Sequence, residues 1–351
     1  MKRASFALFA TLALGGHALG GAAHAEMAAN ARPLLAEGLD FSLPAQAPAQ
    51  SLASIDITAF RLSPEASGAA AGEKPPLPIR EAGGPRPAWT DHVPRSESAY
   101  PTFGRQVGRI KWETLGVLGY FTLVNSPKFF RDTRPLHFKN EGWFGKSTAN
   151  LGVDKLTHAF DSYILAEALH ARLHDRTHAS GGDALTAALL ATGAMFYSEL
   201  SDGIESDSGI SLQDIAMNTA GATFSLLRNT VPGLREKLDF RLLLIPNSNI
   251  YSRTGKRHYA QQRYLMALQL AGFERFRETP LRLVELHAGY YASDFTNQDI
   301  ARGKTPRRHL FVGVGINLRE LLFRSPRSRA GRIAGVGLDY LQVPYTAAHW
   351  D

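Results

Sequence analysis

The hydrophobic pattern of the chain changes its period at Pro232, and this change constrains the fold more than any other feature of the sequence. Before Pro232, apolar residues recur at helical spacing, whereas after it they alternate with other residues over several short segments. A helical period buries one side of a helix, and an alternating period buries one face of a strand. We therefore expect an α+β fold, in which a buried bundle of about four helices precedes an antiparallel β-meander that packs on the bundle or forms a partial barrel.

Four helices are expected before Pro232. The pattern predicts them at about residues 104–123, 154–174, 184–202 and 211–227. The third is apolar over almost all of residues 184–197. This run is too short to span a bilayer comfortably, so it predicts the buried central helix of the bundle rather than a membrane span.

Five segments after Pro232 have the composition and alternation of strands. They are residues 240–245, 257–270, 281–292, 308–318 and 336–343. The fourth alternates most clearly, with one face formed by Leu310, Val312, Val314, Ile316 and Leu318. Because a closed membrane barrel needs about eight strands, a curved sheet packed on the helices is the simpler prediction.

The N-terminus has the three parts of a secretory signal peptide, which we place at residues 1–25. Lys2 and Arg3 precede an apolar run, and Ala23-His24-Ala25 fits the rule for cleavage between small residues. We expect the mature chain to begin near Glu26. An uncleaved anchor is the alternative, but the apolar run is shorter than the roughly 20 residues of a spanning helix.

The remaining chain divides into three predicted regions. Residues 26–100 are rich in Ala, Pro, Gly and Ser, so we expect a mostly disordered linker, in which residues 51–62 are either a strand or an apolar patch. Residues 101–232 form the helical domain, and residues 233–351 form the β-rich region.

Charge and composition exclude several classes of function. The net charge is +7, and the positive residues are spread along the chain without a nucleic-acid-binding motif. We therefore expect no nucleic-acid partner, whereas an anionic membrane surface stays possible. The chain contains no Cys, which excludes disulfides, thiol catalysis, thiolate metal sites and an acylated N-terminal Cys.

Polar side chains gather on the last three predicted helices at spacings that place them on shared faces. The candidate site residues are Asp154, His158, Glu199, Asp202, Asp214 and Asn218. Asp154 has a plain structural explanation as a first-turn charge, and Asp214 has one as part of the helix cap that begins at Ser211. Together the candidates would leave costly buried polar groups unless they meet, so we expect one shared polar centre. A metal site, an acid–base site and a structural hydrogen-bond network all remain open, and the sequence identifies no metal or cofactor.

These residues resemble the signature of domain-of-unknown-function family 2279, the predicted periplasmic lipoproteins. The similar segments are DKLTH at 154–158, Glu199 with Asp202, GISLQD at 209–214, NTAGA at 218–222 and FKNEGWFG at 138–145. The order of the motifs is also similar to that of VanZ-like membrane proteins. The chain departs from the first family by lacking the Cys of a lipobox, and from the second by having too few and too short apolar helices. Neither resemblance implies an established reaction.

We expect an uncharacterised exported envelope protein with a structural or binding role, in the periplasm and peripherally attached to the outer membrane. Its partner would be membrane lipid or another envelope protein. Tyr290 and Tyr291 are predicted to be exposed, and with basic residues near them they would suit a lipid headgroup interface. The basic residues are Arg302, Lys304, Arg307 and Arg308.

Whether the protein is an enzyme stays open. The alternative function is a metal-assisted hydrolase that acts on a lipid or cell-wall substrate through Asp154, His158, Glu199 and Asp214. The sequence has no nucleophile-elbow, zincin, Walker or dinucleotide-binding motif. A Ser-His-Asp triad that uses Ser201 or Ser211 with His158 is the least supported interpretation.

Overall fold

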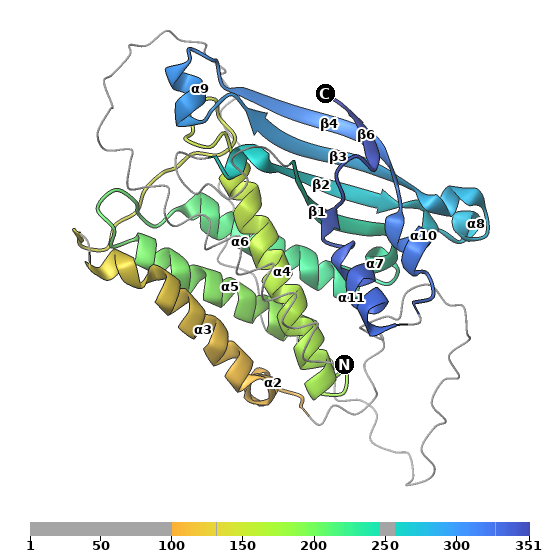
Figure 1. Cartoon of the computed structure of the whole chain (residues 1–351). Helices are drawn as coiled ribbons and strands as arrows, with labels where there is room; N and C mark the ends of the chain where they lie inside the picture. Colours follow the sequence, from red (N-terminus) through yellow and green to blue (C-terminus); the bar gives the residue numbers. More distant parts are fainter. Residues whose placement is uncertain (1–99, 131, 246–256, 327) are drawn as a thin grey trace, which may run out of the picture. The chain divides into compact units, whose positions relative to one another are not determined.

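The computed structural model describes residues 100–130, 132–245, 257–326 and 328–351. All of them belong to one of the two units into which the chain divides. The predicted signal peptide, the linker and the strand considered at residues 51–62 lie outside the described residues. Within the described part, helices precede a six-stranded sheet, so the predicted α+β class is confirmed (Figure 1).

Up to residue 237, helices are the main regular elements of the described chain, and irregular segments join them. The long ones are α3 (Lys111–Asn125), α4 (Val153–Arg176), α5 (Asp183–Asp202) and α6 (Leu212–Thr230), and the short ones are α2 (Phe103–Arg109) and α7 (Leu234–Lys237). The single helix predicted at about residues 104–123 is wrong, because α2 and α3 are separate. At Ile110 the backbone leaves the helical region (φ −124°, ψ 25°), and the Ile110 side chain is fully buried.

The sheet has the strand order β5-β1-β2-β3-β4-β6. Its strands are β1 (Leu238–Leu244), β2 (Gln262–Gln269), β3 (Val284–Ser293), β4 (Arg307–Ile316), β5 (Leu341–Gln342) and β6 (Ala347–Trp350). Strands β1 to β4 form the predicted antiparallel meander, and β6 extends it from β4. The sheet is nevertheless mixed, because β5 pairs with β1 in parallel.

The strand predicted at residues 336–343 is mostly wrong. Helix α11 (Arg329–Gly337) occupies its first part, and only β5 is extended. Ser328 caps α11 by accepting a hydrogen bond from the Gly331 N–H (3.0 Å), and Val336 is one of the buried residues of the helix. The capped helix that begins at Arg329 therefore continues into the predicted strand, although the sequence there alternates. The other short helices of this half are α8 (Glu274–Arg277), α9 (Asn297–Ala301) and α10 (Leu318–Phe323).

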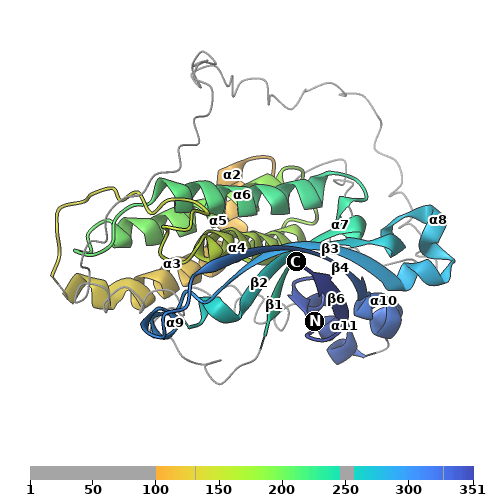
Figure 2. The same cartoon turned by 90° about the horizontal axis from the view of Figure 1, so that it is seen from above.

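The helices and the sheet form layers around one core. Helices α3 to α6 lie on one side of the curved sheet, and α10 and α11 lie on the other (Figure 2). Phe160 of α4 packs edge-on against Phe240 of β1, and it also contacts Tyr264 of β2. The predicted packing of the sheet on the helices is therefore confirmed through aromatic contacts.

The central buried helix is α4, and the prediction that the apolar α5 has this place is wrong. Leu185, Leu189 and Phe196 of α5 are 43%, 53% and 43% exposed. Helix α4 contacts α5, α6 and strands β1, β2 and β3, and most of its residues are buried. Several of its buried charged residues have partners, as Glu167 does in Arg228 and Lys155 in Asp214, so a mixed sequence can occupy the centre.

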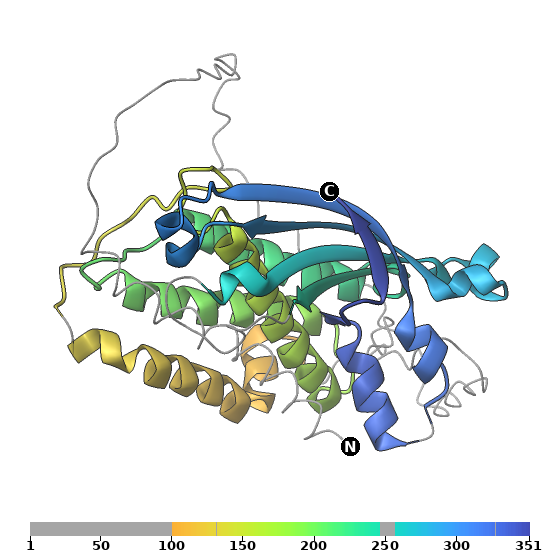
Figure 3. The ribbon, with the colours of Figure 1, turned by 45° about the horizontal axis from the view of Figure 1, so that its top comes forward.

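The expected exposure of two tyrosines is also corrected. Tyr290 is buried, its ring packs edge-on against Phe144, and its hydroxyl donates to the Leu151 carbonyl. Tyr291 is half-buried and stacks on His309 at 4.3 Å between ring centroids. Leu310 and Val312 of β4 and Trp350 of β6 are apolar side chains that are exposed instead. Strand β4 runs between the ends of the sheet that carry α9 and α8 (Figure 3).

Candidate functional site

Three helices bring the candidate residues together at their ends. Asp154 and His158 lie in the first turns of α4, Glu199 lies near the end of α5, and Asp214 lies in the first turn of α6. Close packing of α6 on α4 makes this possible, because a Cβ atom at Gly221 would lie 1.9 Å from the Ala159 carbonyl oxygen. Gly221 therefore allows α6 to approach α4 closely.

His158 lies between two carboxylates. Its Nδ1 is 3.6 Å from Glu199 Oε1, and its Nε2 is 3.6 Å from Asp214 Oδ1. Both separations are too long for direct hydrogen bonds but suit charge attraction or a bridging water or ion. The two ring nitrogens therefore link the end of α5 to the start of α6.

Lys155 neutralises a second group of carboxylates beside His158. Its Nζ lies 2.8 Å from Glu141, 3.0 Å from Asp154 and 2.8 Å from Asp214. Burial alone would lower the pKa of Lys155, but the three carboxylates raise it well above its usual value. Lys155 is therefore an ammonium ion that occupies the centre of this carboxylate group.

Sequence reasoning assigned no role to Lys155 or Glu141. One signal was available for Lys155, because a lysine in the first turn of a helix opposes the helix dipole and so indicates an anionic partner. Glu141 carried no comparable signal. It lies in the irregular segment between α3 and α4, and its position depends on how that segment folds over the helices.

A pocket of about 40 Å³ lies among these side chains. It is lined by Asp154, His158, Glu199, Asp202 and Asp214 together with Glu141 and Tyr259. Since one water needs about 10–15 Å³ of such volume, the pocket has room for a few waters or for an ion with its waters. It is too small to enclose a lipid or a sugar.

The remaining candidates differ in their surroundings. Asp202 lines the pocket, and its carboxylate also accepts a hydrogen bond from Lys128. Asn218 is buried one turn beyond Asp214 but is not among the residues that line the pocket, and its side-chain amide has no hydrogen-bond partner among the described residues. Five of the six candidates therefore surround the pocket, and Asn218 lies outside it. Their functional role stays a prediction.

Ser211 has a structural task. Its side chain caps α6 by accepting a hydrogen bond from the Asp214 N–H at 3.2 Å, as the sequence indicates. The Asp214 carboxylate accepts instead from Lys155. The cap therefore fixes the start of α6 and directs the Asp214 carboxylate into the site.

The pocket retains protons near neutral pH. Burial lowers the pKa of His158, but Asp214 and Glu199 outweigh it and raise it to about 9. Burial raises the pKa of Glu199 to about 8 in spite of His158. Burial likewise raises the pKa of Asp214. The site can therefore exchange a proton, or exchange a proton for a cation.

Two sets of side chains in the pocket have the spacing of metal ligands. In each set, the ligand atoms lie within 4.8 Å of one another. One consists of Glu141, Asp154 and Asp214, and the Lys155 ammonium lies among them. The other consists of His158, Glu199 and Asp214, so this second set is the candidate cation site.

No helix in the described ranges combines the length and apolar character that crossing a membrane requires.

A comparison with known protein families agrees with the motifs. Neither a curated protein nor a solved structure matches the chain. Residues 140–230 match the model of a family described as predicted periplasmic lipoprotein (DUF2279), and the resemblance that the motifs predict is confirmed over this part of the chain.

Proposed function

We propose that the protein is exported to the cell envelope, has a binding role there, and binds one divalent cation through His158, Glu199 and Asp214. The main evidence for cation binding is that one nitrogen and two carboxylate oxygens lie within 4.8 Å of one another beside a pocket of about 40 Å³. This volume suits an ion that keeps some of its waters.

The charges of the site support cation binding. Glu199 and Asp214 are both buried, and burial makes their charged forms costly. Lys155 compensates Asp214 directly, whereas no hydrogen bond to Glu199 supports its carboxylate within the described contacts. A divalent cation would stabilise both carboxylates and would displace a proton from the site.

The donor set indicates the kind of cation. One imidazole and two carboxylates suit ions that prefer oxygen ligands, such as Mn²⁺ or Ca²⁺. Catalytic zinc sites usually include more nitrogen or sulfur ligands. We therefore choose Mn²⁺ as the probe for this site.

The test is titration of the purified full chain with Mn²⁺, followed by calorimetry and by the electron paramagnetic resonance of free Mn²⁺. Glu199→Gln keeps the shape of the side chain and removes its charge, so we expect Mn²⁺ affinity to fall by about tenfold or more. Glu274→Gln is the matched control, because Glu274 is exposed on α8. Equal Mn²⁺ affinity of the wild type and Glu199→Gln would contradict the proposal.

A metal-assisted hydrolase acting on a lipid or cell-wall substrate is the second candidate. It is supported by Asp154, which lines the pocket but is not one of the three proposed ligands. A cation can activate a bound water, and a neighbouring carboxylate can accept its proton. The Mn²⁺-loaded full chain should then release product from phospholipid vesicles or peptidoglycan, and Asp154→Asn should abolish release while Mn²⁺ stays bound. Intact substrates under these conditions would exclude this candidate.

Contact with an anionic lipid surface is the proposed basis of envelope attachment. Leu310, Val312 and Trp350 are 79%, 61% and 58% exposed on β4 and β6. Arg302 is exposed at the end of α9, and Arg307 is exposed at the start of β4. Apolar side chains beside positive charges fit the interface of an anionic bilayer.

Vesicle flotation tests this contact. The full chain should float with vesicles that contain anionic lipid and less with neutral vesicles, because the arginines add attraction only to the former. Leu310→Glu should reduce flotation. Leu123→Glu is the control, since Leu123 is 73% exposed on α3. Flotation that is lost only in the Leu123→Glu variant would contradict the assignment. Absence of flotation with both vesicle types would also contradict it and would favour a protein partner.

A further inference from the structure

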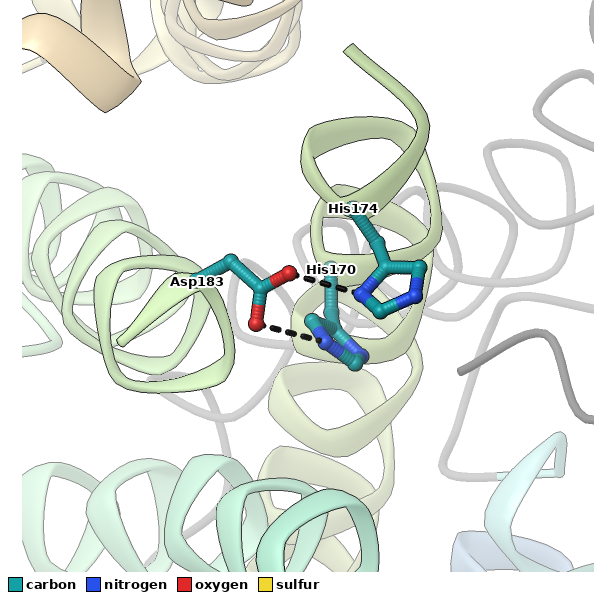
Figure 4. Close-up of side chains that lie close together, drawn as sticks. All are labelled: His170, His174 and Asp183. Carbon is teal, nitrogen blue, oxygen red and sulfur yellow. Dashed lines mark hydrogen bonds and ion pairs between the residues drawn. The ribbon is translucent and has the colours of Figure 1, made fainter. Parts of the chain in front are cut away.

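A second group of potential ligands lies at the other end of α4. It consists of His170 and His174 in the last turns of α4 and Asp183 at the start of α5 (Figure 4). His170 and His174 are separated by four residues, so both side chains are on the same face of α4. None of these residues lines the pocket around His158.

The turn between α4 and α5 brings Asp183 to this face. His178, Ala179 and Gly182 have positive φ angles of 56°, 60° and 80°, which reverse the chain within a few residues. Asp183 directly follows Gly182 and is the first residue of α5. Its carboxylate is therefore held against the two rings by the backbone of the turn.

The carboxylate contacts both rings. Asp183 Oδ1 is 3.3 Å from His170 Nε2, and Asp183 Oδ2 is 2.7 Å from His174 Nδ1 (Figure 4). His170 and Asp183 are buried, and the His174 side chain is 14% exposed. The group is thus largely enclosed but accessible from one side.

We propose that His170, His174 and Asp183 form a binding site for a divalent transition metal ion, with Zn²⁺ as the ion that fits best. Two imidazole nitrogens and one carboxylate are a known type of three-residue ligand set for zinc, which leaves a fourth position for water. With bonds of about 2.0–2.1 Å, the ligand atoms around a tetrahedral Zn²⁺ lie about 3.3 Å apart. His170 Nε2 lies 3.3 Å from Asp183 Oδ1, and one ligand atom from each of the three residues lies within 4.8 Å of the others, so small movements of the side chains would place them around one ion.

Metal binding requires an ionised carboxylate and ring nitrogens that are free of protons on the side of the ion. When Zn²⁺ binds, each ring coordinates as a neutral imidazole through the nitrogen that faces Asp183 and carries its proton on the other nitrogen. A ring that is already neutral changes tautomer, and a ring protonated on both nitrogens releases one proton to solvent.

The structural alternative is a carboxylate that joins two helices by accepting hydrogen bonds from both rings. It predicts that the three residues stabilise the fold and that the protein binds no metal ion there.

The site is also independent of the proposed Mn²⁺ site, because His170 lies twelve residues after His158 on α4, which is about 18 Å along the helix axis. Failure of one proposal therefore leaves the other intact.

The experiment titrates metal-free full chain with Zn²⁺, and with Co²⁺ as a spectroscopic probe, in the Glu199→Gln background that weakens the first site. We expect one Zn²⁺ to bind and the visible absorption of Co²⁺ with nitrogen ligands to appear. His174→Gln should lower Zn²⁺ affinity by at least about tenfold. His178→Gln is the matched control, because His178 is exposed in the adjacent turn and should leave Zn²⁺ affinity unchanged.

Two outcomes would overturn the proposal. One is the absence of Co²⁺ absorption and of Zn²⁺ binding in the Glu199→Gln protein, and the other is equal Zn²⁺ affinity of the His174→Gln and His178→Gln variants. Circular dichroism and the midpoint of thermal unfolding, compared with those of His178→Gln, show whether His174→Gln is folded. If it is not, Asp183→Asn tests the same loss of affinity with a smaller change of shape.

Discussion

Lys155 shows how a single buried side chain can decide whether a polar centre is stable. Its ammonium is enclosed by three carboxylates, and the side chain is 1% exposed. Such an arrangement is not strongly stabilising in itself, but removing the cation leaves buried negative charge without a partner. The candidate site therefore depends on Lys155 for its stability, whatever ion or substrate it binds.

Lys155→Met should lower the free energy of unfolding by about 3–5 kcal/mol at neutral pH, because Met fills the space without supplying charge. Urea denaturation of the full chain measures this change. Lys146→Met serves as the control, since Lys146 is exposed, and it should change the free energy by less than about 0.5 kcal/mol. Equal stability of the two variants would show that Lys155 is not needed as a counter-ion.

Residue-scale prediction from the sequence succeeds where helical spacing decides the geometry. Asp154 and His158 lie one turn apart on one face, and the cap at Ser211 fixes the start of the helix that carries Asp214, so local rules predict which side chains share a face. Glu141 could not be placed in this way. Its contact with Lys155 depends on the tertiary position of an irregular segment, which has no periodic signal.

At the scale of elements, the contact between α4 and α6 places the strictest limit on side-chain size. Gly221 lies against the backbone of Ala159, so α6 can approach α4 only without a side chain at this position. This contact sets the distance between the helix starts that carry His158 and Asp214. Small residues at a helix interface have this effect because backbones then pack directly.

Gly221→Ala should destabilise the protein by about 1–3 kcal/mol or more, because the added methyl group overlaps the Ala159 carbonyl. Thermal unfolding compares it with Gly193→Ala, a control in the interior of α5 where nothing lies within 4 Å of the added carbon. The control should instead gain about 0.5–1 kcal/mol, since alanine favours helices. The same sign for both variants would contradict the close contact.

The type of an element could be predicted where one hydrophobic period dominated its sequence. Which of its faces is buried could not be predicted, because contacts with distant residues decide it. The alternation of β4 was correct, yet its apolar face is largely exposed while Phe311 and two glycines of the other face are buried. Alternation fixes which residues share a face, but not which face is covered. In the same way, α4 is central because its charges are paired, and pairing partners such as Arg228 cannot be identified from hydropathy alone.

On the scale of the whole molecule, a buried ionic network connects the helices to the sheet. Glu167 of α4 lies 3.3 Å from Arg228 and 3.1 Å from Arg235, and it accepts a hydrogen bond from Tyr340 at 2.8 Å. Arg228 also pairs with Asp239 of β1. The layers are therefore joined by charge as well as by aromatic contacts.

The network predicts sensitivity to acid. Burial would raise the pKa of Glu167, but Arg235 and Arg228 outweigh it and lower the pKa from 4.5 to about 2. A lowered pKa in the folded state contributes stability above pH 4.5, and this contribution is lost as the pH falls from about 4.5 to about 2. It amounts to about 3 kcal/mol at neutral pH.

Glu167→Gln should remove this part of the pH dependence, measured as the free energy of unfolding at several pH values between 7 and 2. The variant is less stable than the wild type at pH 7, and the difference should shrink as the pH falls. Glu274→Gln, at an exposed position, should keep the wild-type pH profile. A wild-type slope in Glu167→Gln would show that the network does not control acid unfolding.

The central claim is that His158, Glu199 and Asp214 bind a divalent cation, and anomalous X-ray diffraction from crystals of the full chain with Mn²⁺ tests it most directly. The account predicts a manganese peak bonded to one His158 nitrogen and to oxygens of Glu199 and Asp214, which are already within 4.8 Å of one another. It also predicts that the peak is absent in Glu199→Gln crystals. A wild-type map in which His158 lies between the two carboxylates without a manganese peak would contradict the claim and identify the centre as a structural network.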